Sequence, residues 1–198
     1  MSRRALMIDL ETLGSGDRVH VPVLQVGVAV FEVEDGVASI LDNGCFHIGL
    51  DGATQDPASP PIEKDTMDWW LKQPDEVREL VFFPRATTSS QKAESLVLNM
   101  HTEIGMHIRT GFAVSSIWAN GVADFQWLTG LFNRYNLTPP WAYNMPRDYR
   151  TVRELAHQKN GGPIDPHPQI GLSHNAVDDA VWQCHMLAKY LHVLGLEL

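Results

Sequence analysis

The chain is poor in cysteine and in long apolar runs. Its 198 residues include only two cysteines, which are too few for a disulfide framework and lack the spacing of metal ligands. We expect Cys45 and Cys184 to be buried, reduced thiols. No run of 18 apolar residues is present, so the sequence predicts no membrane span. The N-terminal segment does not read as a signal peptide, and these absences together favour a cytosolic protein.

Basic residues are also scarce. Lysine and arginine total 15 against 24 acidic residues, which gives a formal net charge of −9. This balance argues against broad non-specific binding to nucleic acid, because such binding depends on basic surface. It does not exclude an enzyme that acts on nucleic acid, because bound divalent cations offset carboxylates at the one place that meets phosphate.

The remaining composition is that of a globular chain, with 44% hydrophobic and 20% charged residues. The length favours one domain over residues 1–198. Alternating apolar patterns predict strands over Ala5–Leu10, Leu24–Val33 and Val37–Leu50, and Asp35-Gly36 predicts a hairpin turn between the last two. The patterns that follow predict helices over 65–71, 74–82, 90–109, 122–135, 147–158 and 174–194, short strands at 116–119 and 141–143, and loops over 52–61 and 160–173. This order predicts an α/β fold in which an antiparallel three-strand meander joins parallel strands in a mixed sheet flanked by helices.

The first predicted strand carries two acids where apolar residues are expected. Asp9 and Glu11 alternate with Ile8 and Leu10, and side chains two residues apart on a strand point to the same face. Burying two unneutralised carboxylates side by side costs several kcal/mol. Divalent cations prefer carboxylate oxygen, so this pair predicts a metal site. The alternative is a pair of surface acids at a strand end, which the apolar neighbours oppose.

Two further segments place acids at element junctions. The short strand that ends at Asn120-Gly121 is followed by a helix with Asp124 in its first turn, where an acid also suits the helix dipole. His174 begins the last predicted helix, and Asp178 and Asp179 lie about one turn inside it. The helical wheel leaves open which of these two acids faces the site, because both flank the apolar face at similar angles.

These segments together resemble the 3′–5′ exonucleases that carry an Asp-Glu-Asp-Asp site with a histidine general base (DEDDh type) on a ribonuclease-H-like fold. The Asp-x-Glu motif is Asp9/Glu11, and the middle acid is Asp124. The closing His-x-Ala-x-x-Asp motif runs from His174, and its spacing selects Asp179 as the fourth carboxylate. Longer matches resemble a phage and prophage branch of the family that includes a mycobacterial exoribonuclease: residues 8–14, 67–70, 149–151 and 174–176.

The resemblance implies a ribonuclease-H-like sheet and two-metal hydrolysis of phosphodiesters to nucleoside 5′-monophosphates. It implies Mg²⁺ or Mn²⁺ as two bound ions and single-stranded 3′ ends of RNA or DNA as substrate. Several members dimerise, so a homodimer is a further expectation. The catalytic residues implied are Asp9, Glu11, Asp124, His174 and Asp179, with the four carboxylates as metal ligands and His174 as general base. The substrate contacts implied are Glu11 to the terminal 3′-hydroxyl and the backbone of Thr12 and Leu13 to the last nucleotide.

Other residues keep two interpretations each. Trp69 and Trp70 either stack on bases or pack a short helix on the sheet. Arg147 and Arg150 either contact phosphate or form structural ion pairs, and Asp148 is expected to cap a helix rather than bind a metal. Two other functions compete with the exonuclease: a catalytically weak binding module of the same fold, which the complete five-residue set opposes, and a metal-dependent phosphatase of another fold, which the His-x-Ala-x-x-Asp helix opposes.

Overall fold

The structure is a computed structural model that describes residues 3–15, 20–50, 61–83 and 93–198. The predicted loop at 52–61 and the predicted start of a helix at Ser90 therefore lie largely outside the described residues. The elements, in chain order, are β1 (Arg4–Thr12), β2 (Val23–Glu34), β3 (Val37–Gly49), α1 (Lys64–Trp70), α2 (Asp75–Phe82), α3 (Ala93–Met106), the π-helical turn η1 (His107–Gly111), β4 (Ser116–Ala119), α4 (Val122–Arg134), β5 (Pro146–Asp148), α5 (Tyr149–Asn160) and α6 (Ala176–Leu194).

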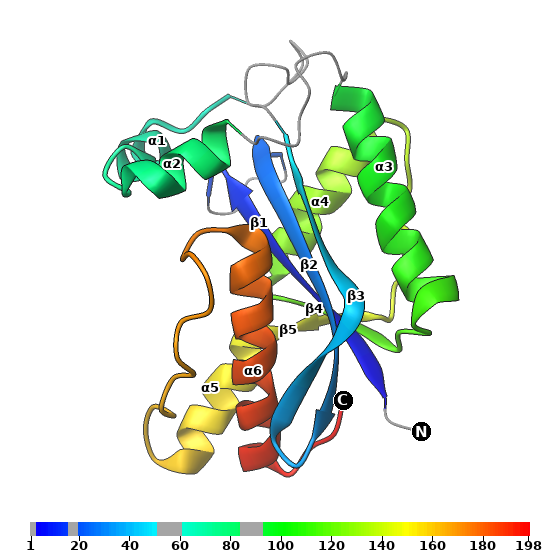
Figure 1. The fold of residues 1–198 in the computed structure, drawn as a ribbon, viewed down its shortest axis with the longest axis vertical. Helices are drawn as coiled ribbons and strands as arrows, with labels where there is room; N and C mark the ends of the chain where they lie inside the picture. The colour runs from blue at the N-terminus through cyan, green and yellow to red at the C-terminus, as the bar shows by residue number, and fades with distance from the viewer. Residues whose placement is uncertain (1–2, 16–19, 51–60, 84–92) are drawn as a thin grey trace.

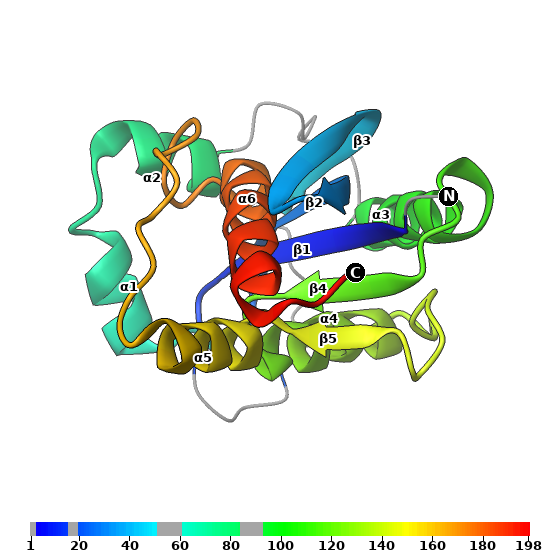
Figure 2. The ribbon, with the colours of Figure 1, turned by 90° about the horizontal axis from the view of Figure 1, so that it is seen from below.

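The five strands form one mixed sheet in the order β3-β2-β1-β4-β5. β1, β2 and β3 pair antiparallel, whereas β4 and β5 add in parallel to β1 (Figures 1 and 2). The predicted meander is thus confirmed. Its turn has Asp35 at φ 49° and Gly36 at φ 79°, the two positive φ values that a tight hairpin of this kind requires.

Helices cover both faces of the sheet (Figures 1 and 2). Alternate residues of β1 pack against different helices on the two faces. Its alternate residues Leu6, Ile8 and Leu10 join a core cluster with α3 and α4. Ala5 and Met7 point the other way and join a second cluster with α5 and α6. Because side chains alternate along a strand, Asp9 and Glu11 continue the row that faces α6.

A third, smaller cluster attaches α1 and α2 to the end of β1. Trp70 is 1% exposed and packs with residues that include Leu13 and Val81. The indole Nε1 of Trp70 donates a hydrogen bond to the carbonyl oxygen of Thr12 at 2.9 Å, and the N–H of Glu63 donates to the carbonyl of Leu13 at 2.9 Å. The two short helices are therefore held where β1 ends.

Two local predictions were wrong. The last strand is Pro146–Asp148, which pairs with Ile117–Ala119, and not the segment 141–143. Trp141 lies in a loop and packs against the core cluster that contains residues of α3 and α4, which accounts for its apolar character. A three-residue edge strand that begins with proline has no alternation to detect, and proline is tolerated there because an edge strand needs fewer donors. Cys45 is also exposed rather than buried, whereas Cys184 is buried as expected.

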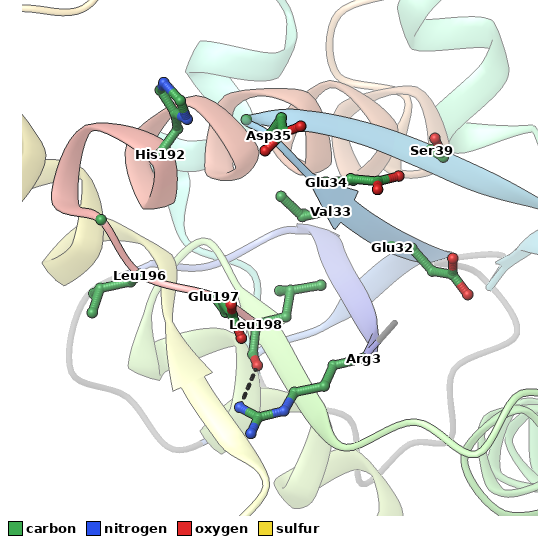
Figure 3. A pocket seen from close by; sticks show the side chains of 12 residues that line it. Arg3, Glu32, Val33, Glu34, Asp35, Ser39, His192, Leu196, Glu197 and Leu198 are labelled. Atoms are coloured by element: carbon green, nitrogen blue, oxygen red, sulfur yellow. Dashed lines mark hydrogen bonds between the residues drawn. The ribbon is translucent and has the colours of Figure 1, made fainter. Parts of the chain in front are cut away.

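At the opposite end of the sheet, where β1 begins, the surface is hollowed and acidic. The hollow has a volume of about 900 Å³ and lies between the β2–β3 turn and the residues that follow α6 (Figure 3). Arg3 reaches across it to donate a hydrogen bond from Nη1 to the carbonyl oxygen of Leu198 at 3.0 Å. Its acidic side chains are Glu32, Glu34, Asp35 and Glu197.

None of the helices in the described ranges has both the length and the apolar character that crossing a bilayer requires.

Candidate active site

Asp9 and Glu11 lie at the end of β1, on the face covered by α6, and they are 6% and 8% exposed. The side chain of Gln183 on α6 donates a hydrogen bond from Nε2 to Oδ1 of Asp9 at 2.7 Å. Burial raises the pKa of Asp9 well above its ordinary value, and the charge of Asp124 raises that pKa further. The Gln183 hydrogen bond opposes the rise because an N–H donor favours the ionised carboxylate.

Glu11 shows the same conflict between burial and charge. Burial, with a second contribution from the charge of Asp9, raises the pKa of Glu11 to about 9. The charges of Asp179 and Asp124 add to this rise, so four predicted site carboxylates act on one another. A carboxyl group in such surroundings stays protonated at neutral pH unless a positive charge joins it.

Asp124 lies near the same end of β1, on the helix that follows β4. β4 ends at Ala119 and α4 begins at Val122, so the first turn of α4 places Asp124 beside the end of β1, where it is 9% exposed. Burial raises the pKa of Asp124 to about 7, and the nearby Arg150 guanidinium lowers that pKa. Arg150 also lowers the pKa of Asp9, so it is a cation close to both carboxylates.

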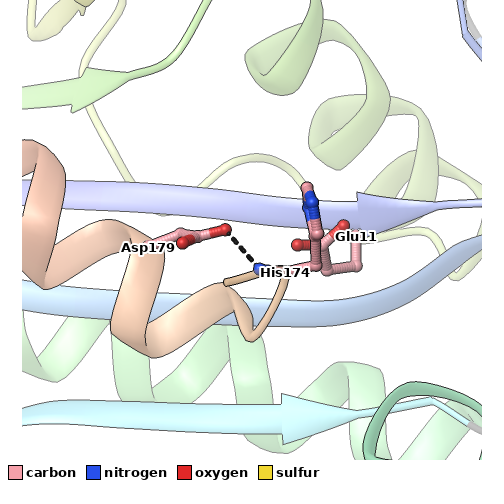
Figure 4. A group of neighbouring side chains, drawn as sticks. All are labelled: Glu11, His174 and Asp179. Atoms are coloured by element: carbon pink, nitrogen blue, oxygen red, sulfur yellow. Dashed lines mark hydrogen bonds between the residues drawn. The ribbon is translucent and has the colours of Figure 1, made fainter. Parts of the chain in front are cut away.

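His174 and Asp179 come from the segment that leads into α6. The backbone N–H of His174 donates to Oδ2 of Asp179 at 2.9 Å (Figure 4). His174 has φ 65°, a left-handed conformation that is uncommon for a residue with a Cβ and is often found at functional sites. The helix therefore starts at Ala176 and not at His174, because this residue departs from helical geometry.

The structure decides between the two acids that the helical wheel left open. Asp179 faces the site, and burial raises its pKa although the His174 hydrogen bond opposes the rise. Asp178 instead accepts hydrogen bonds from the N–H of Leu172 and from Nδ2 of Asn175, at 2.9 and 2.8 Å. Asp178 therefore fixes the loop before α6.

A glycine on β2 brings α6 close enough for these contacts. Gly27 pairs with Asp9 in the β1–β2 register. A Cβ added at Gly27 would lie 2.1 Å from the carbonyl carbon of Ala176 and 2.3 Å from the amide nitrogen of Val177. Only glycine permits this approach of the α6 backbone to the sheet, and that approach sets how near Asp179 comes to β1.

The donor set fits a divalent cation. Glu11, His174 and Asp179 each offer a ligand atom within 4.8 Å of the others, whereas Asp9 and Asp124 lie outside this group of three (Figure 4). The close group thus contains two of the four predicted carboxylates and the histidine, and charge interactions link Asp9 and Asp124 to it. Carboxylate oxygens with raised pKa values favour hard cations such as Mg²⁺ or Mn²⁺, because a bound cation removes the repulsion that burial intensifies.

Two of the residues predicted to contact the substrate already make hydrogen bonds within the protein. Leu13 is 2% exposed, its N–H donates to the carbonyl of Pro22 and its carbonyl accepts from Glu63. The hydroxyl of Thr12 donates to the carbonyl of Gly14 at 2.7 Å. The backbone of Leu13 and the hydroxyl of Thr12 are therefore already hydrogen-bonded within the protein, and contact of the Thr12 and Leu13 backbone with a nucleotide stays a prediction.

The two neighbouring tryptophans have different environments. Trp70 is buried and packs α1 on the sheet, as one interpretation predicted. Trp69 is 41% exposed, and its ring lies edge-on to that of His174 with centroids 4.9 Å apart. Asp148 caps α5 as expected, because its Oδ1 accepts from the N–H of Thr151 at 2.7 Å.

Sequence reasoning missed Gln183. The only signal available was its position four residues after Asp179, which places both on one side of α6. Polar residues on a helix face otherwise indicate solvent, and nothing in the sequence pairs Gln183 with the first strand.

Comparison with known proteins matched the chain to one family and to several solved structures of similar fold. Residues 4–191 match the family model described as the 3′-5′ exoribonuclease Rv2179c-like domain. A search of curated protein sequences returned no match. Similar solved structures include cell-death related nuclease 4 (CRN-4), with a TM-score of 0.63 and 11% identity over 98% of this chain and 65% of that one.

Two other structures have the same fold. A 3′-exonuclease that recognises the 3′ end of a histone mRNA stem-loop has a TM-score of 0.57 and 14% identity, over 100% of this chain and 84% of that one. Exonuclease I of E. coli, solved with an oligonucleotide, has a TM-score of 0.56 and 14% identity, over 96% of this chain and 41% of that one. The chain thus spans just under two thirds of CRN-4 and less than half of exonuclease I. At such identities the likeness establishes the fold, and the predicted ribonuclease-H-like mixed sheet is confirmed.

Proposed function

We propose that this chain, which belongs to the Rv2179c-like family of 3′–5′ exoribonuclease domains, removes nucleoside 5′-monophosphates from single-stranded 3′ ends of RNA or DNA. The observation that carries the proposal is the set of buried carboxylates beside His174. Asp9, Glu11 and Asp124 are each at most 9% exposed, and burial raises the pKa of each. Such a cluster is unfavourable for folding alone and favourable for binding cations, which would in turn attract the negatively charged phosphodiester.

Asp9, Glu11, Asp124 and Asp179 are the groups we propose to hold two Mg²⁺ or Mn²⁺ ions. Bound there, the ions would neutralise the carboxylates and stabilise the charge on the attacking and leaving oxygens of an in-line displacement. The charges of Asp124 and Asp179 both raise the pKa of Asp9, so Asp9 would share the bound ions with carboxylates from two other elements.

His174 is the proposed general base, which takes a proton from the attacking water. Its backbone is held by the hydrogen bond to Asp179, and its ring packs against Trp69. These two contacts act from different sides, one on the main chain and one on the ring. They limit the orientations of His174, and a general base must be oriented toward the attacking water.

Several groups are proposed to contact the substrate. Glu11 would bind the terminal 3′-hydroxyl, and the backbone of Thr12 and Leu13 would contact the last nucleotide. The exposed ring of Trp69 is proposed to stack on a base near the scissile phosphate, because stacking accepts any base. Arg150, whose Nε lies 3.5 Å from Oδ1 of Asn120, is proposed to contact phosphate. Arg147 is less suited, since its guanidinium donates to the carbonyls of neighbouring residues.

The proposal is tested with matched single-stranded RNA and DNA labelled at the 5′ end, each incubated with Mg²⁺, Mn²⁺ or a chelator. We expect a ladder that shortens from the 3′ end and mononucleotides carrying a 5′-phosphate, only with the cations. A substrate blocked by a 3′-phosphate separates exonuclease from endonuclease cleavage. Binding of the strand without release of mononucleotides under either cation would contradict hydrolysis and favour the weak binding module.

Stacking by Trp69 is tested separately, and Leu71 at the same end of α1 provides the matched control. Trp69→Ala should raise KM for a single-stranded oligonucleotide roughly 5- to 100-fold, the loss of one stacked base. Leu71→Ala, at a residue 57% exposed on the end of α1, should leave KM unchanged, and Trp69→Phe should retain most of the affinity. Equal effects of Trp69→Ala and Leu71→Ala on KM would rule out stacking.

A further inference from the structure

Among the described residues, Gln183 lies outside the five-residue set and its side chain donates a hydrogen bond to Asp9. It lies one helical turn after Asp179 on α6 and is 4% exposed. The contact joins residues 174 positions apart in the chain. A buried amide placed on a carboxylate in this way has a role that burial in a core does not explain, because an apolar side chain would fill the same space without a desolvation cost.

A second buried glutamine shows what a structural role looks like. Gln25 is fully buried, and its Nε2 donates to the carbonyl of Leu80 at 3.0 Å while its Oε1 accepts from the N–H of Ala176 at 3.3 Å. Both ends of that amide bind backbone and tie α2 and α6 to β2. Gln183 instead binds a carboxylate, and its Oε1 has no hydrogen-bond partner among the described residues.

The chemistry of an amide suits this place. Its N–H occupies one lone pair of Asp9 Oδ1 and stops the carboxylate from rotating, so the remaining lone pairs keep one direction. A lysine or arginine here would neutralise Asp9 and compete with a cation, whereas a glutamine carries no charge. Oε1 belongs to the same amide group, so an acceptor for a water or hydroxyl proton also lies beside Asp9.

We infer that Gln183 is a positioning residue of the cation site, which holds the Asp9 carboxylate in the orientation that receives a divalent ion. The inference rests on the proposed function for the identity of the site, and its readout is cation binding without nucleic acid. Partners that orient metal ligands change metal affinity or activity by about 10- to 100-fold when they are removed.

The experiment titrates the purified protein with Mn²⁺ and follows the free ion by electron paramagnetic resonance. Gln183→Met keeps the length and volume of the side chain but removes the donor, and it should weaken Mn²⁺ binding about 10- to 100-fold. Cys184→Ala is the control, because Cys184 is the next residue on α6 and is also buried, and it should leave Mn²⁺ affinity unchanged. Thermal unfolding in chelator reports any general loss of folding.

A second variant guards against misfolding of the first. Gln183→Asn keeps the amide but is one methylene shorter, so it cannot keep the 2.7 Å contact, and it should also weaken Mn²⁺ binding. Wild-type affinity in either folded variant overturns the inference, as does a loss of affinity that Cys184→Ala shares. If the variants lose Mn²⁺ and the wild type binds it but cleaves no nucleic acid, the proposed function fails and the role of Gln183 stands.

Discussion

Two acidic regions lie at opposite ends of β1, and they differ in the burial and the pairing of their carboxylates. At one end Asp9 and Glu11 are buried and face α6. At the other end Arg4 pairs with Glu32 across the β1–β2 register, beside the hollow rimmed by Glu34 and Asp35 (Figure 3). Arg4 and Glu11 are seven positions apart along the strand, which is roughly 23 Å at about 3.3 Å per residue.

The candidate site is distinguished from the hollow by the burial of its acidic side chains and not by their number. At the hollow, Nε of Arg4 donates to Oε1 of Glu32 at 2.7 Å, and Glu34 and Asp35 are open to solvent. At the site, burial is the largest cause of the raised pKa of Asp9 and of Glu11. Solvent and arginine already stabilise the first group of charges, whereas the second group needs a ligand.

The largest expected effect comes from removing one charge in each region. Asp9→Asn should lower turnover at least ~100-fold, because it removes a charge on which cations depend. Its stability in chelator should not fall, since burial already favours the neutral form of Asp9. Glu34→Gln, an equal change at the hollow, should leave turnover within about twofold. Exonuclease assays and thermal unfolding of both variants check this, and a similar loss of turnover in both would erase the contrast.

The next effect tests whether the site depends on the approach of α6. Gly27→Ala places a methyl group against the α6 backbone, and we expect a loss of about 2–3 kcal/mol in the free energy of unfolding. Turnover should fall at least ~10-fold, because small displacements of catalytic groups are costly.

A second glycine provides the control for that change. A Cβ at Gly121 would have its nearest contacts at 3.8 Å, from Arg150 and Asp124. Gly121→Ala should therefore cost less than about 1 kcal/mol, the scale of a helix N-cap preference. Denaturant unfolding measures both losses. Equal stability of the two variants would show that the α6 approach is not what fixes Asp179.

The sequence was sufficient where a residue contradicted its surroundings. Acids inside the apolar strand around Asp9 predicted a site because buried charge needs a partner, and Asp35-Gly36 predicted the turn because few residues accept its conformation. The antiparallel pairing of the first three strands followed from their short connections. The resemblance then selected Asp179 over Asp178, which periodicity alone did not.

The sequence was insufficient where the determining contact is distant or local geometry is irregular. Gln183 lies 174 residues from Asp9, and no pattern within either segment reports that pairing. Asp178 turns to the loop at Leu172, whose path has no period to detect. The strand Pro146–Asp148 exists only because β4 offers it a partner.

A smaller effect links the site to pH. The raised pKa of Glu11, about 9 against an ordinary 4.5, and of Asp124, about 7 against 3.8, means that the folded protein without cations binds more protons than the unfolded chain between these values. This contribution to stability is complete below the unfolded pKa values and is lost as pH rises through about 7 and then about 9. Stability in chelator should therefore fall from about pH 5.5 to about pH 8.

Cations should reverse that trend, because they bind the ionised carboxylates. The rise in Tm on adding Mn²⁺ should be at least about 4 °C larger at about pH 8 than at about pH 5.5, since 1 kcal/mol corresponds to about 2–4 °C for a chain of this size. Thermal unfolding in Mn²⁺ and in chelator at both pH values provides the measurement. A shift that is the same at both would mean that the buried carboxylates are not where Mn²⁺ binds, and Glu34→Gln should not change the outcome.

The smallest effect is expected at the hollow itself. Arg4→Gln removes the ion pair with Glu32, whose side chains are 41% and 24% exposed. Partly exposed pairs contribute about 0–1 kcal/mol, so the free energy of unfolding should fall by no more than about 1 kcal/mol, and less in about 0.5 M salt than in about 0.05 M. Turnover should not change. A loss above about 2 kcal/mol that salt does not reduce would mean that this end of β1 also depends on a shielded charge, and burial would then no longer separate the two acidic regions.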